Sequence, residues 1–278
     1  MVTPDEAIHE RLLRDVLRIL GKMDLRQSPP AMAQRIHRLI RELTGQSDPY
    51  RAVKDRFNRL AMDIYPSLKA KVEGSADPLV TAIRLAIAGN IIDMGVDNYL
   101  TDEQVHEAID HALVAPFDAD LAGFREAISK ARNILYLADN AGEIVFDQLL
   151  IEQMPLEKVT VAVKGSPIIN DATMADAEMV GLTGLVKVID NGSDAPGTIL
   201  EDCSKSFRQH FDKADLVIAK GQGNYETLSD IEKDIFFILK AKCPVIAEDI
   251  GCEVGSLVLR RASCAKSGAG KEKNYAGI

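Results

Sequence analysis

The sequence predicts an α/β protein in which an all-helical N-terminal subdomain precedes a Rossmann-like α/β/α layered domain with a mainly parallel sheet. Two observations predict this. Residues 1–130 carry apolar stripes at helical spacing, whereas residues 131–278 alternate short apolar runs with helix-sized segments. Such alternation indicates crossover connections between parallel strands. We therefore expect two subdomains, 1–130 and 131–278.

The N-terminal region shows repeated helix start and stop signals. A capping side chain stands ahead of first-turn prolines at Ser28, Asp48 and Asp77. Glycines that can end the helices follow at Gly45, Gly74 and Gly95. Apolar residues recur at helical spacing over 12–20 and 36–43, so each of these helices needs a partner surface.

The second region contains five apolar runs of the kind that form buried strands. They span residues 134–137, 159–163, 185–189, 216–219 and 236–246. The segment after Leu259 is polar, small and basic, and we expect it to be mobile at its end.

The composition excludes several classes of protein. The chain has 278 residues, of which 46% are hydrophobic and 27% are charged, and its net charge is −9. This negative balance argues against a broad nucleic-acid surface. The most apolar run, 79–96, contains Arg84, Asn90 and Asp93, so we expect a core helix there and no membrane span. Residues near Met1 do not resemble a secretory signal, and we expect a cytoplasmic protein.

The cysteines do not predict a metal site or a disulfide framework. Cys203, Cys243, Cys252 and Cys264 form no Cys-x-x-Cys pair. We expect reduced and mostly buried thiols.

Polar residues directly follow four of the expected strands. The segments are Asp139-Asn140, Lys164 to Asp171, Asp190 to Asp194, and Lys220 to Glu226. The carboxyl ends of parallel strands meet at one edge of a sheet, where open α/β sheets bind ligands. We expect these side chains to converge there.

The oxygen atoms of this edge suit a hard divalent cation. Asp139, Asn140 and Asp171 offer carboxylate and amide oxygens, which favour Mg²⁺ or Mn²⁺. Such a mixed site also tolerates Co²⁺ and Ni²⁺. Asp190 and its neighbours are left out, because this residue mixture is common in turns.

The same edge carries groups that suit phosphate. Lys220 and Lys240 supply positive charge, and Gly221 and Gly223 let backbone N–H groups approach an anion. A helix that begins near Gly142 directs its positive end to the same place. A cation with lysines and backbone donors is typical of phosphoryl transfer.

Each of these features also has a purely structural interpretation. Asp139-Asn140 and Asn170-Asp171 can be turns or helix caps. The Lys220 segment lacks the spacing of a Walker A loop. Lys240 can be an edge lysine that extends to solvent. The convergence of all four segments favours a functional site.

Four blocks of the sequence resemble the signature blocks of the damage-control phosphatases, formerly a domain of unknown function, and are most similar to its small archaeal and bacterial branch. The blocks are Asp139-Asn140-Ala141-Gly142-Glu143 with Asp147, Lys164-Gly165-Ser166-Pro167 with Asn170-Asp171, Lys220-Gly221-Gln222-Gly223-Asn224-Tyr225-Glu226, and Leu239-Lys240-Ala241-Lys242-Cys243-Pro244. The resemblance implies a divalent-metal-dependent phosphatase that acts on small phosphorylated metabolites such as sugar phosphates.

The resemblance also implies roles for individual residues. The metal ligands of the family match Asp139, Asn140 and Asp171. The substrate-contacting positions match Gln222, Gly223, Asn224 and Tyr225, with a later lysine that best matches Lys240. Asn90 and Asp93 lie one helical turn apart and can bring the helical region to the site, or can form a buried interdomain hydrogen bond. Members of this branch often carry Cys-x-x-Cys near the N-terminus, and this chain has no cysteine before Cys203.

The sequence leaves open which of two nucleophiles attacks the phosphate. Either a metal-activated water attacks phosphorus, or Asp139 attacks and forms an aspartyl-phosphate. Asp176 is a candidate general acid or base.

Two other classes of protein also fit the sequence. One is an adenosylmethionine-dependent carboxyl methyltransferase, although only Gly142 follows Asp139 where a glycine-rich turn is usual. The other is a non-catalytic metabolite-binding protein. The substrate and the oligomeric state cannot be read from the sequence.

Overall fold

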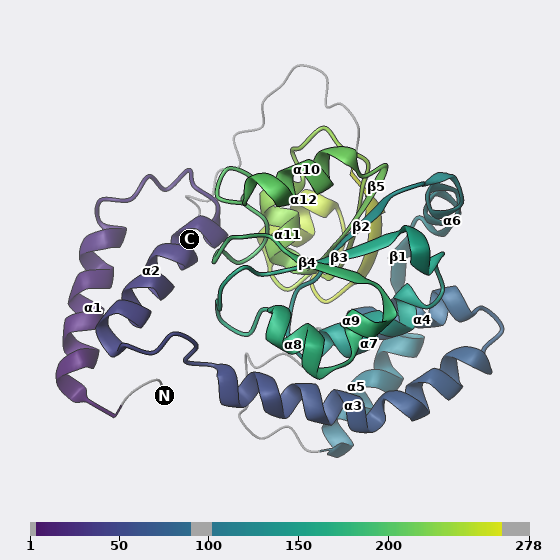
Figure 1. The fold of residues 1–278 in the computed structure, drawn as a ribbon, viewed down its shortest axis with the longest axis horizontal. Coiled ribbons are helices and arrows are strands. Elements are labelled where there is room, and N and C mark those ends of the chain that lie inside the picture. The colour runs from purple at the N-terminus through teal and green to yellow at the C-terminus, as the bar shows by residue number, and fades with distance from the viewer. Residues whose placement is uncertain (1–3, 90–101, 263–278) are drawn as a thin grey trace.

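The protein is described by a computed structural model that covers residues 4–89 and 102–262. These residues contain one seven-stranded sheet with helices on both faces (Figure 1). The strand order is β1-β7-β6-β5-β2-β3-β4, and all neighbouring strands are parallel except β6 and β7. The strands are β1 (Phe117–Ala119), β2 (Ile134–Leu137), β3 (Val159–Val163), β4 (Lys187–Asp190), β5 (Leu216–Lys220), β6 (Ile235–Lys240) and β7 (Leu257–Arg261). The predicted mainly parallel α/β architecture is confirmed.

Helices dominate the first part of the described chain. They are α1 (Glu6–Leu20), α2 (Pro29–Thr44), α3 (Arg51–Glu73), α4 (Pro78–Gly89), α5 (Asp102–Val114) and α6 (Leu121–Lys130). The Ser28, Asp48 and Asp77 signals stand at or just before the starts of α2, α3 and α4, and Gly45 and Gly74 end the first two of these. The Gly95 stop lies outside the described residues.

The remaining helices connect the strands. They are α7 (Glu143–Ile151), the 3₁₀ turn η1 (Leu156–Lys158), α8 (Met174–Met179), α9 (Leu182–Leu185), α10 (Lys205–Lys213), α11 (Gly221–Leu228) and α12 (Pro244–Ile250).

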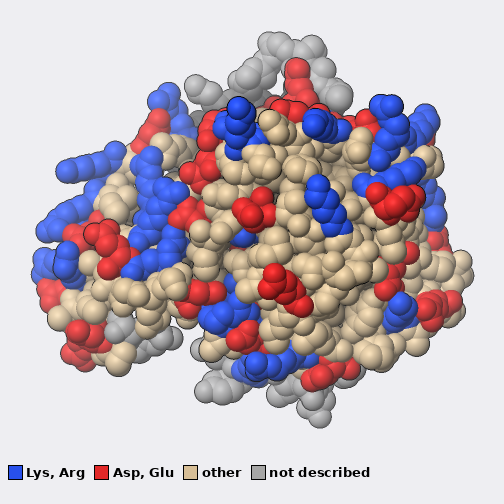
Figure 2. Space-filling model, viewed as in Figure 1, with Lys and Arg blue, Asp and Glu red and all other residues tan. Residues whose placement is uncertain are grey.

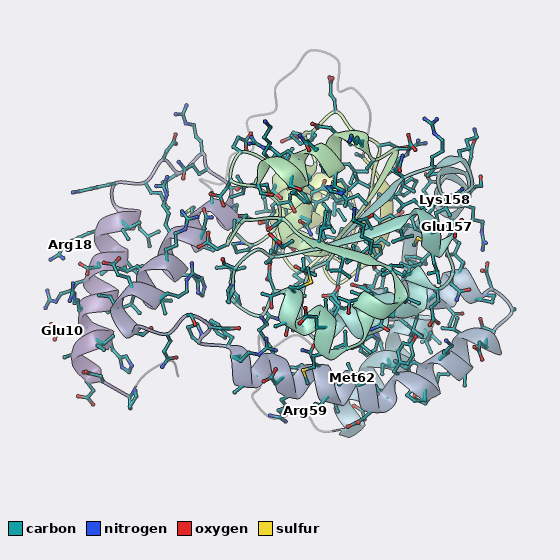
Figure 3. All side chains as sticks on the ribbon, in the orientation of Figure 1. Glu10, Arg18, Arg59, Met62, Glu157 and Lys158 are labelled. Carbon is teal, nitrogen blue, oxygen red and sulfur yellow. The ribbon has the colours of Figure 1, made fainter. Side chains whose placement is uncertain are left out.

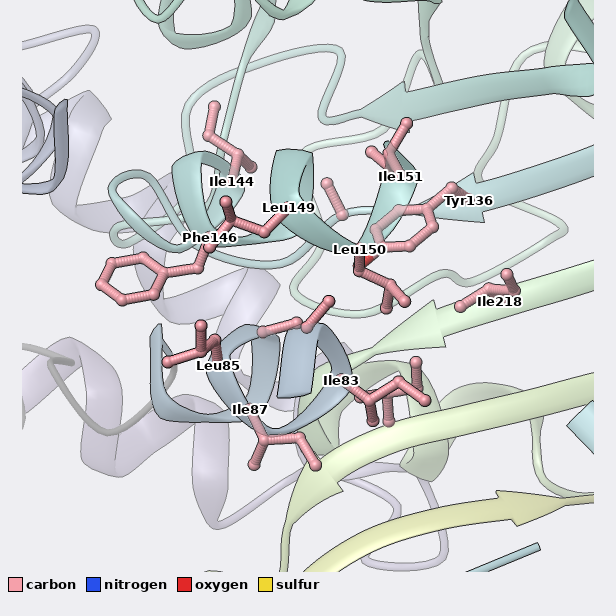
Figure 4. Packing of buried hydrophobic residues seen from close by; sticks show 14 of the residues in the cluster. Ile83, Leu85, Ile87, Tyr136, Ile144, Phe146, Leu149, Leu150, Ile151 and Ile218 are labelled. Carbon is pink, nitrogen blue, oxygen red and sulfur yellow. The ribbon is translucent and has the colours of Figure 1, made fainter. Parts of the chain in front are cut away.

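Alternating side chains of the central strands supply two apolar cores. Ile134 and Tyr136 of β2 face the core that includes α3, α4 and α7, whereas Leu135 and Leu137 face the core that includes α10 and α12. Figure 4 shows the first core, in which α4 and α7 pack against Tyr136 and Ile218. Strands buried on both faces are mostly apolar, which explains why β2 is a continuous apolar run and why Thr160 is the one polar residue of β3.

Three expectations about the elements need correction. The run at 185–189 is strand only from Lys187, because the residues before it form α9. The run at 236–246 is split, because Pro244 starts α12. The segment after Leu259 is not wholly a polar tail, since β7 extends to Arg261 and pairs with β6. Residues 263–278 lie outside the described part.

One short strand interrupts the region that was expected to be wholly helical. Strand β1 pairs with β7, the last strand of the described residues. The division into subdomains at residue 130 therefore stays a prediction.

The hairpin of α1 and α2 lies beside the α/β part (Figure 1). Helix α2 lies near α11, and its side chains bind the loop after β4. Figure 2 shows Lys and Arg side chains gathered over this hairpin, and Figure 3 shows Glu10 and Arg18 of α1 projecting to solvent. Helix α1 packs on α2, and side chains of α2 join the hairpin to the α/β part.

Two further findings concern the membrane span and the disulfides that the sequence did not predict. Among residues 4–89 and 102–262, the helices are too short or too polar to cross a membrane. Within the same residues the cysteines are free thiols: Cys203 is buried, whereas Cys243 and Cys252 are half-buried. The expectation of mostly buried thiols is therefore wrong for two of these three, and Cys264 lies outside the described part.

Candidate metal and phosphate site

The loop after β3 folds back so that Asp171 lies opposite Asn140. Two backbone hydrogen bonds hold this arrangement: the Ala172 N–H donates to the Asp139 carbonyl at 2.8 Å, and the Ala141 N–H donates to the Asn170 carbonyl at 2.8 Å. The three oxygen-bearing side chains that the sequence predicted as metal ligands thus come from adjacent turns at the carboxyl ends of β2 and β3.

Negative charge accumulates around Asp139. Burial raises the pKa of this carboxyl well above its ordinary value, and the nearby charges of Glu143 and Asp171 raise it further. The positive charges of Lys242 and Lys164 act in the opposite direction. A bound cation would offset the repulsion between these carboxylates. The carboxylate and amide oxygens of Asp139, Asn140 and Asp171, together with the carboxylate charge around them, fit a hard divalent cation.

Lys164 lies directly beside Asp171. It is buried, its Nζ lies 3.4 Å from Asp171 Oδ2, and it also donates to the Gly197 carbonyl. Lys164 belongs to one of the family-like blocks of the sequence, but no role was predicted for it. The signal that identifies it is its position immediately after β3.

Lys242 is the second lysine that acts on the site. Its positive charge lowers the pKa of Asp139. Lys240 lies half-buried at the end of β6. The Lys242 N–H donates to Gln222 Oε1 at 3.2 Å, which joins the loop after β6 to α11. The sequence predicted Lys240, two residues earlier, as the phosphate-binding lysine, and that role stays a prediction.

The polar residues of α11 are engaged in several contacts. Gln222 Nε2 donates to Glu226 Oε1 at 2.8 Å, and the Tyr225 hydroxyl donates to Asp249 at 2.8 Å. Asn224 is buried: its Nδ2 donates to the Lys220 carbonyl at 2.7 Å and its Oδ1 accepts from Thr198. Gly223 packs on the loop at Gly197, where an added Cβ on Gly197 would lie 2.2 Å from the Gly223 oxygen. Asn224 therefore fixes the turn that carries α11.

Lys220 points away from the predicted phosphate position. Its side chain is fully buried, and its ammonium donates to the Ala86 carbonyl, Glu143 and Asp147 at 2.9, 2.6 and 2.5 Å. Because an ammonium has three N–H donors, these contacts use all of them. The geometry does not favour phosphate binding by Lys220.

Asp176 anchors helix α3 to the α/β part. It is fully buried and accepts hydrogen bonds from Arg51, Asn58 and the hydroxyl of Thr173, and Lys54 Nζ lies 2.8 Å from its Oδ2. Both of its oxygens are thus engaged, which does not favour the predicted role in proton transfer. Asn90 and Asp93 lie outside the described residues.

Comparisons with known proteins show the family to which the chain belongs. Residues 1–258 match the family model described as the damage-control phosphatase ARMT1-like domain. A damage-control phosphatase of Archaeoglobus fulgidus is 37% identical over 266 residues, covering 94% of this chain and 92% of that protein. One of Pyrococcus horikoshii is 37% identical over 267 residues, covering 94% and 91%. The crystal structure of a DUF89 family protein from P. horikoshii superposes with a TM-score of 0.86 at 35% identity, covering 94% of this chain and 92% of that chain.

Proposed function

Because the chain belongs to the damage-control phosphatase family, we propose that it is a divalent-metal-dependent phosphatase that hydrolyses small phosphorylated metabolites. The observation that carries this proposal is the convergence of Asp139, Asn140 and Asp171 next to Lys164. Three oxygen ligands and a buried lysine at one edge of a parallel sheet suit a cation-bound phosphate.

In this proposal the cation is Mg²⁺ or Mn²⁺, with Co²⁺ and Ni²⁺ as alternatives, held by the three side chains. When bound, the cation supplies positive charge to the phosphate and lowers the pKa of a water molecule. Lys164 and the exposed Lys242 balance the remaining charge of the phosphate oxygens. Gln222 links α11 to the backbone at Lys242 and so keeps this lysine close to the site.

Of the two routes to phosphate release, we propose attack by water. The Oδ2 atom of Asp139 accepts a hydrogen bond from Asn140 Nδ2 at 3.1 Å, and it packs against Gly221, which hinders attack by this oxygen. Water adds its oxygen to phosphorus and gives up a proton, while the alcohol leaves with the electrons of its bond and takes up a proton. Acid quenching with a ³²P-labelled substrate should trap no phosphoenzyme.

The direct test is hydrolysis of para-nitrophenyl phosphate after EDTA treatment and re-addition of each metal. Activity should return with Mg²⁺ or Mn²⁺ in the wild-type protein and should stay absent in Asp139→Ala. Asp190→Ala is the matched control, because Asp190 is also a carboxylate at a strand end but is exposed and lies outside the ligand set. Activity that survives EDTA, or that Asp139→Ala retains, would contradict the proposal. Saturable binding of adenosylmethionine would instead support a methyltransferase.

A further inference from the structure

A buried cluster of charged residues lies directly behind the site. It consists of the charged residues Glu143, Asp147 and Lys220 and the neutral Tyr136, each at most 2% exposed, and we call it the Lys220 cluster. Lys220 Nζ donates to both carboxylates, and the Tyr136 hydroxyl donates to Asp147 Oδ1 at 2.8 Å. Burying such charges costs desolvation energy, and a buried ion pair is weak evidence for added stability. The cluster therefore calls for a functional explanation.

A hydrogen bond joins the Lys220 cluster to the predicted ligands. Glu143 Oε2 accepts from Asn140 Nδ2 at 2.9 Å, while Glu143 Oε1 accepts from Lys220 at 2.6 Å. Both oxygens of Glu143 thus have donors. A glutamate engaged in this way is placed to orient Asn140 rather than to bind a cation itself.

The orientation of the Asn140 carboxamide follows from its neighbours. Its Nδ2 donates to Glu143 Oε2 and, at 3.1 Å, to Asp139 Oδ2. If the amide were flipped, its oxygen would face Glu143 Oε2, a carboxylate oxygen that has no proton to donate while Glu143 is paired with Lys220. Glu143 therefore fixes the nitrogen on its own side and the Oδ1 oxygen on the other side.

We propose that Glu143, held in place by Lys220, is a positioning residue that orients Asn140 so that Oδ1 is presented as a cation ligand. The cation in this statement rests on the proposed function, but the fixed orientation does not. The proposal also accounts for Lys220, whose donors are used within the cluster. Outer-shell partners of this kind commonly change metal affinity by about 10–100-fold when mutated.

The orientation can be tested without metal through the side-chain NH₂ signals of Asn140 in ¹⁵N-asparagine-labelled protein, assigned with Asn140→Ser. Slow exchange of these protons with solvent is expected in the wild-type protein and in Asp147→Asn. Asp147→Asn is the matched control, because it removes one negative charge from the same lysine without touching Asn140. Glu143→Gln should lose the protection, because glutamine has a single oxygen and Lys220 is the stronger donor. Equal protection in wild type and Glu143→Gln would overturn the proposal.

Metal affinity gives the second readout through Mn²⁺ titration of a double-mutant cycle. Glu143→Gln should weaken Mn²⁺ binding about 10–100-fold in the wild-type background and should have a much smaller effect in the Asn140→Ala background, where only the charge of Glu143 still acts on the site. A loss of equal size in both backgrounds would show that Glu143 acts without Asn140 and would overturn the positioning role. If the wild-type protein bound no Mn²⁺, the proposed function would fail, while the amide signals would still decide the orientation.

Discussion

Gly221 packs against the carboxylate of Asp139 so closely that a Cβ atom on Gly221 would lie 1.8 Å from Asp139 Oδ2. The residue also has a φ of +78°, a region that side-chain-bearing residues rarely adopt. Both features demand glycine at this position. The turn between β5 and α11 thus limits where the Asp139 carboxylate can lie.

Gly221→Ala should abolish metal-dependent activity, because the added methyl group must displace Asp139. Gly181→Ala is the matched control: Gly181 has a φ of +76° but no atom within 4 Å of its added Cβ. Both variants should lose about 1–2 kcal/mol of stability from backbone strain, but only Gly221→Ala should lose Mn²⁺ binding. Thermal unfolding and Mn²⁺ titration measure the two effects. Normal Mn²⁺ affinity in Gly221→Ala would refute this account of the turn.

Asp171→Ala should act mainly on activity, whereas Asp176→Ala should act mainly on stability. Asp171→Ala should lose metal-dependent turnover with little change in unfolding temperature, because its removal relieves the repulsion that raises the pKa of Asp139 and because Lys164 keeps its hydrogen bond to the Gly197 carbonyl. Asp176→Ala should destabilise the fold by about 3–5 kcal/mol, because it leaves the buried ammonium of Lys54 without its 2.8 Å partner. Metal-dependent turnover rates and unfolding curves of both variants test these two expectations. Full turnover in Asp171→Ala would remove this residue from the ligand set.

Arg41→Ala should lower kcat/KM by about 10-fold or more, since small displacements of reacting groups have effects of this size. Arg41 joins α2 to both loops beside the site: it donates to the Pro167 carbonyl at 2.9 Å and pairs with Asp194. Ile169, two residues before Asp171, has a φ of +43°, so its loop is strained and needs such support. Arg35→Ala, an exposed position on the same helix, should leave the kinetics unchanged. Wild-type kinetics in Arg41→Ala would show that α2 does not support the loop.

The attachment of α2 should weaken in acid. Burial acts to raise the pKa of Asp194, but hydrogen bonds from Arg38 and Gln34 outweigh it and lower this pKa below its ordinary value of 3.8. A lowered folded-state pKa gives stability that is present above pH 3.8 and is lost as the pH falls through the folded value.

Asp194→Asn should therefore be less stable than the wild type by about 1–3 kcal/mol at pH 6, and the difference should shrink as the pH falls below 3.8. Unfolding of both proteins by urea from pH 6 to pH 3 measures this difference. Asp190→Asn serves as the exposed control. A difference that stays constant across this range would rule out the proposed role of the Asp194 carboxylate.

The sequence predicted the parts of the fold that depend on local pattern. Strands β2 and β3 have the predicted bounds because they are apolar runs closed by polar turns. Strand β7 was missed because its two arginines resemble a solvated tail. In the structure Arg260 pairs with Asp118 and Arg261 with Asp234, and only the tertiary fold brings these partners together.

The direction of the lysine side chains at the candidate site also depends on the tertiary fold. A lysine that follows a strand can extend to the ligand or turn back into the protein, and the sequence does not distinguish the two. Lys220 turns back because Glu143 and Asp147 on α7 lie beneath it, whereas Lys164 extends to Asp171. The direction of each lysine is decided by residues distant in sequence.

The central claim is that Asp139, Asn140 and Asp171 together hold a divalent cation. Crystals grown with Mn²⁺ and measured at a wavelength where manganese scatters anomalously test it most directly. The account predicts one strong anomalous peak within coordination distance of all three side-chain oxygens, and its loss in Asp171→Ala. A peak elsewhere, such as between Asp194 and Asp202, with none at these three residues would contradict it.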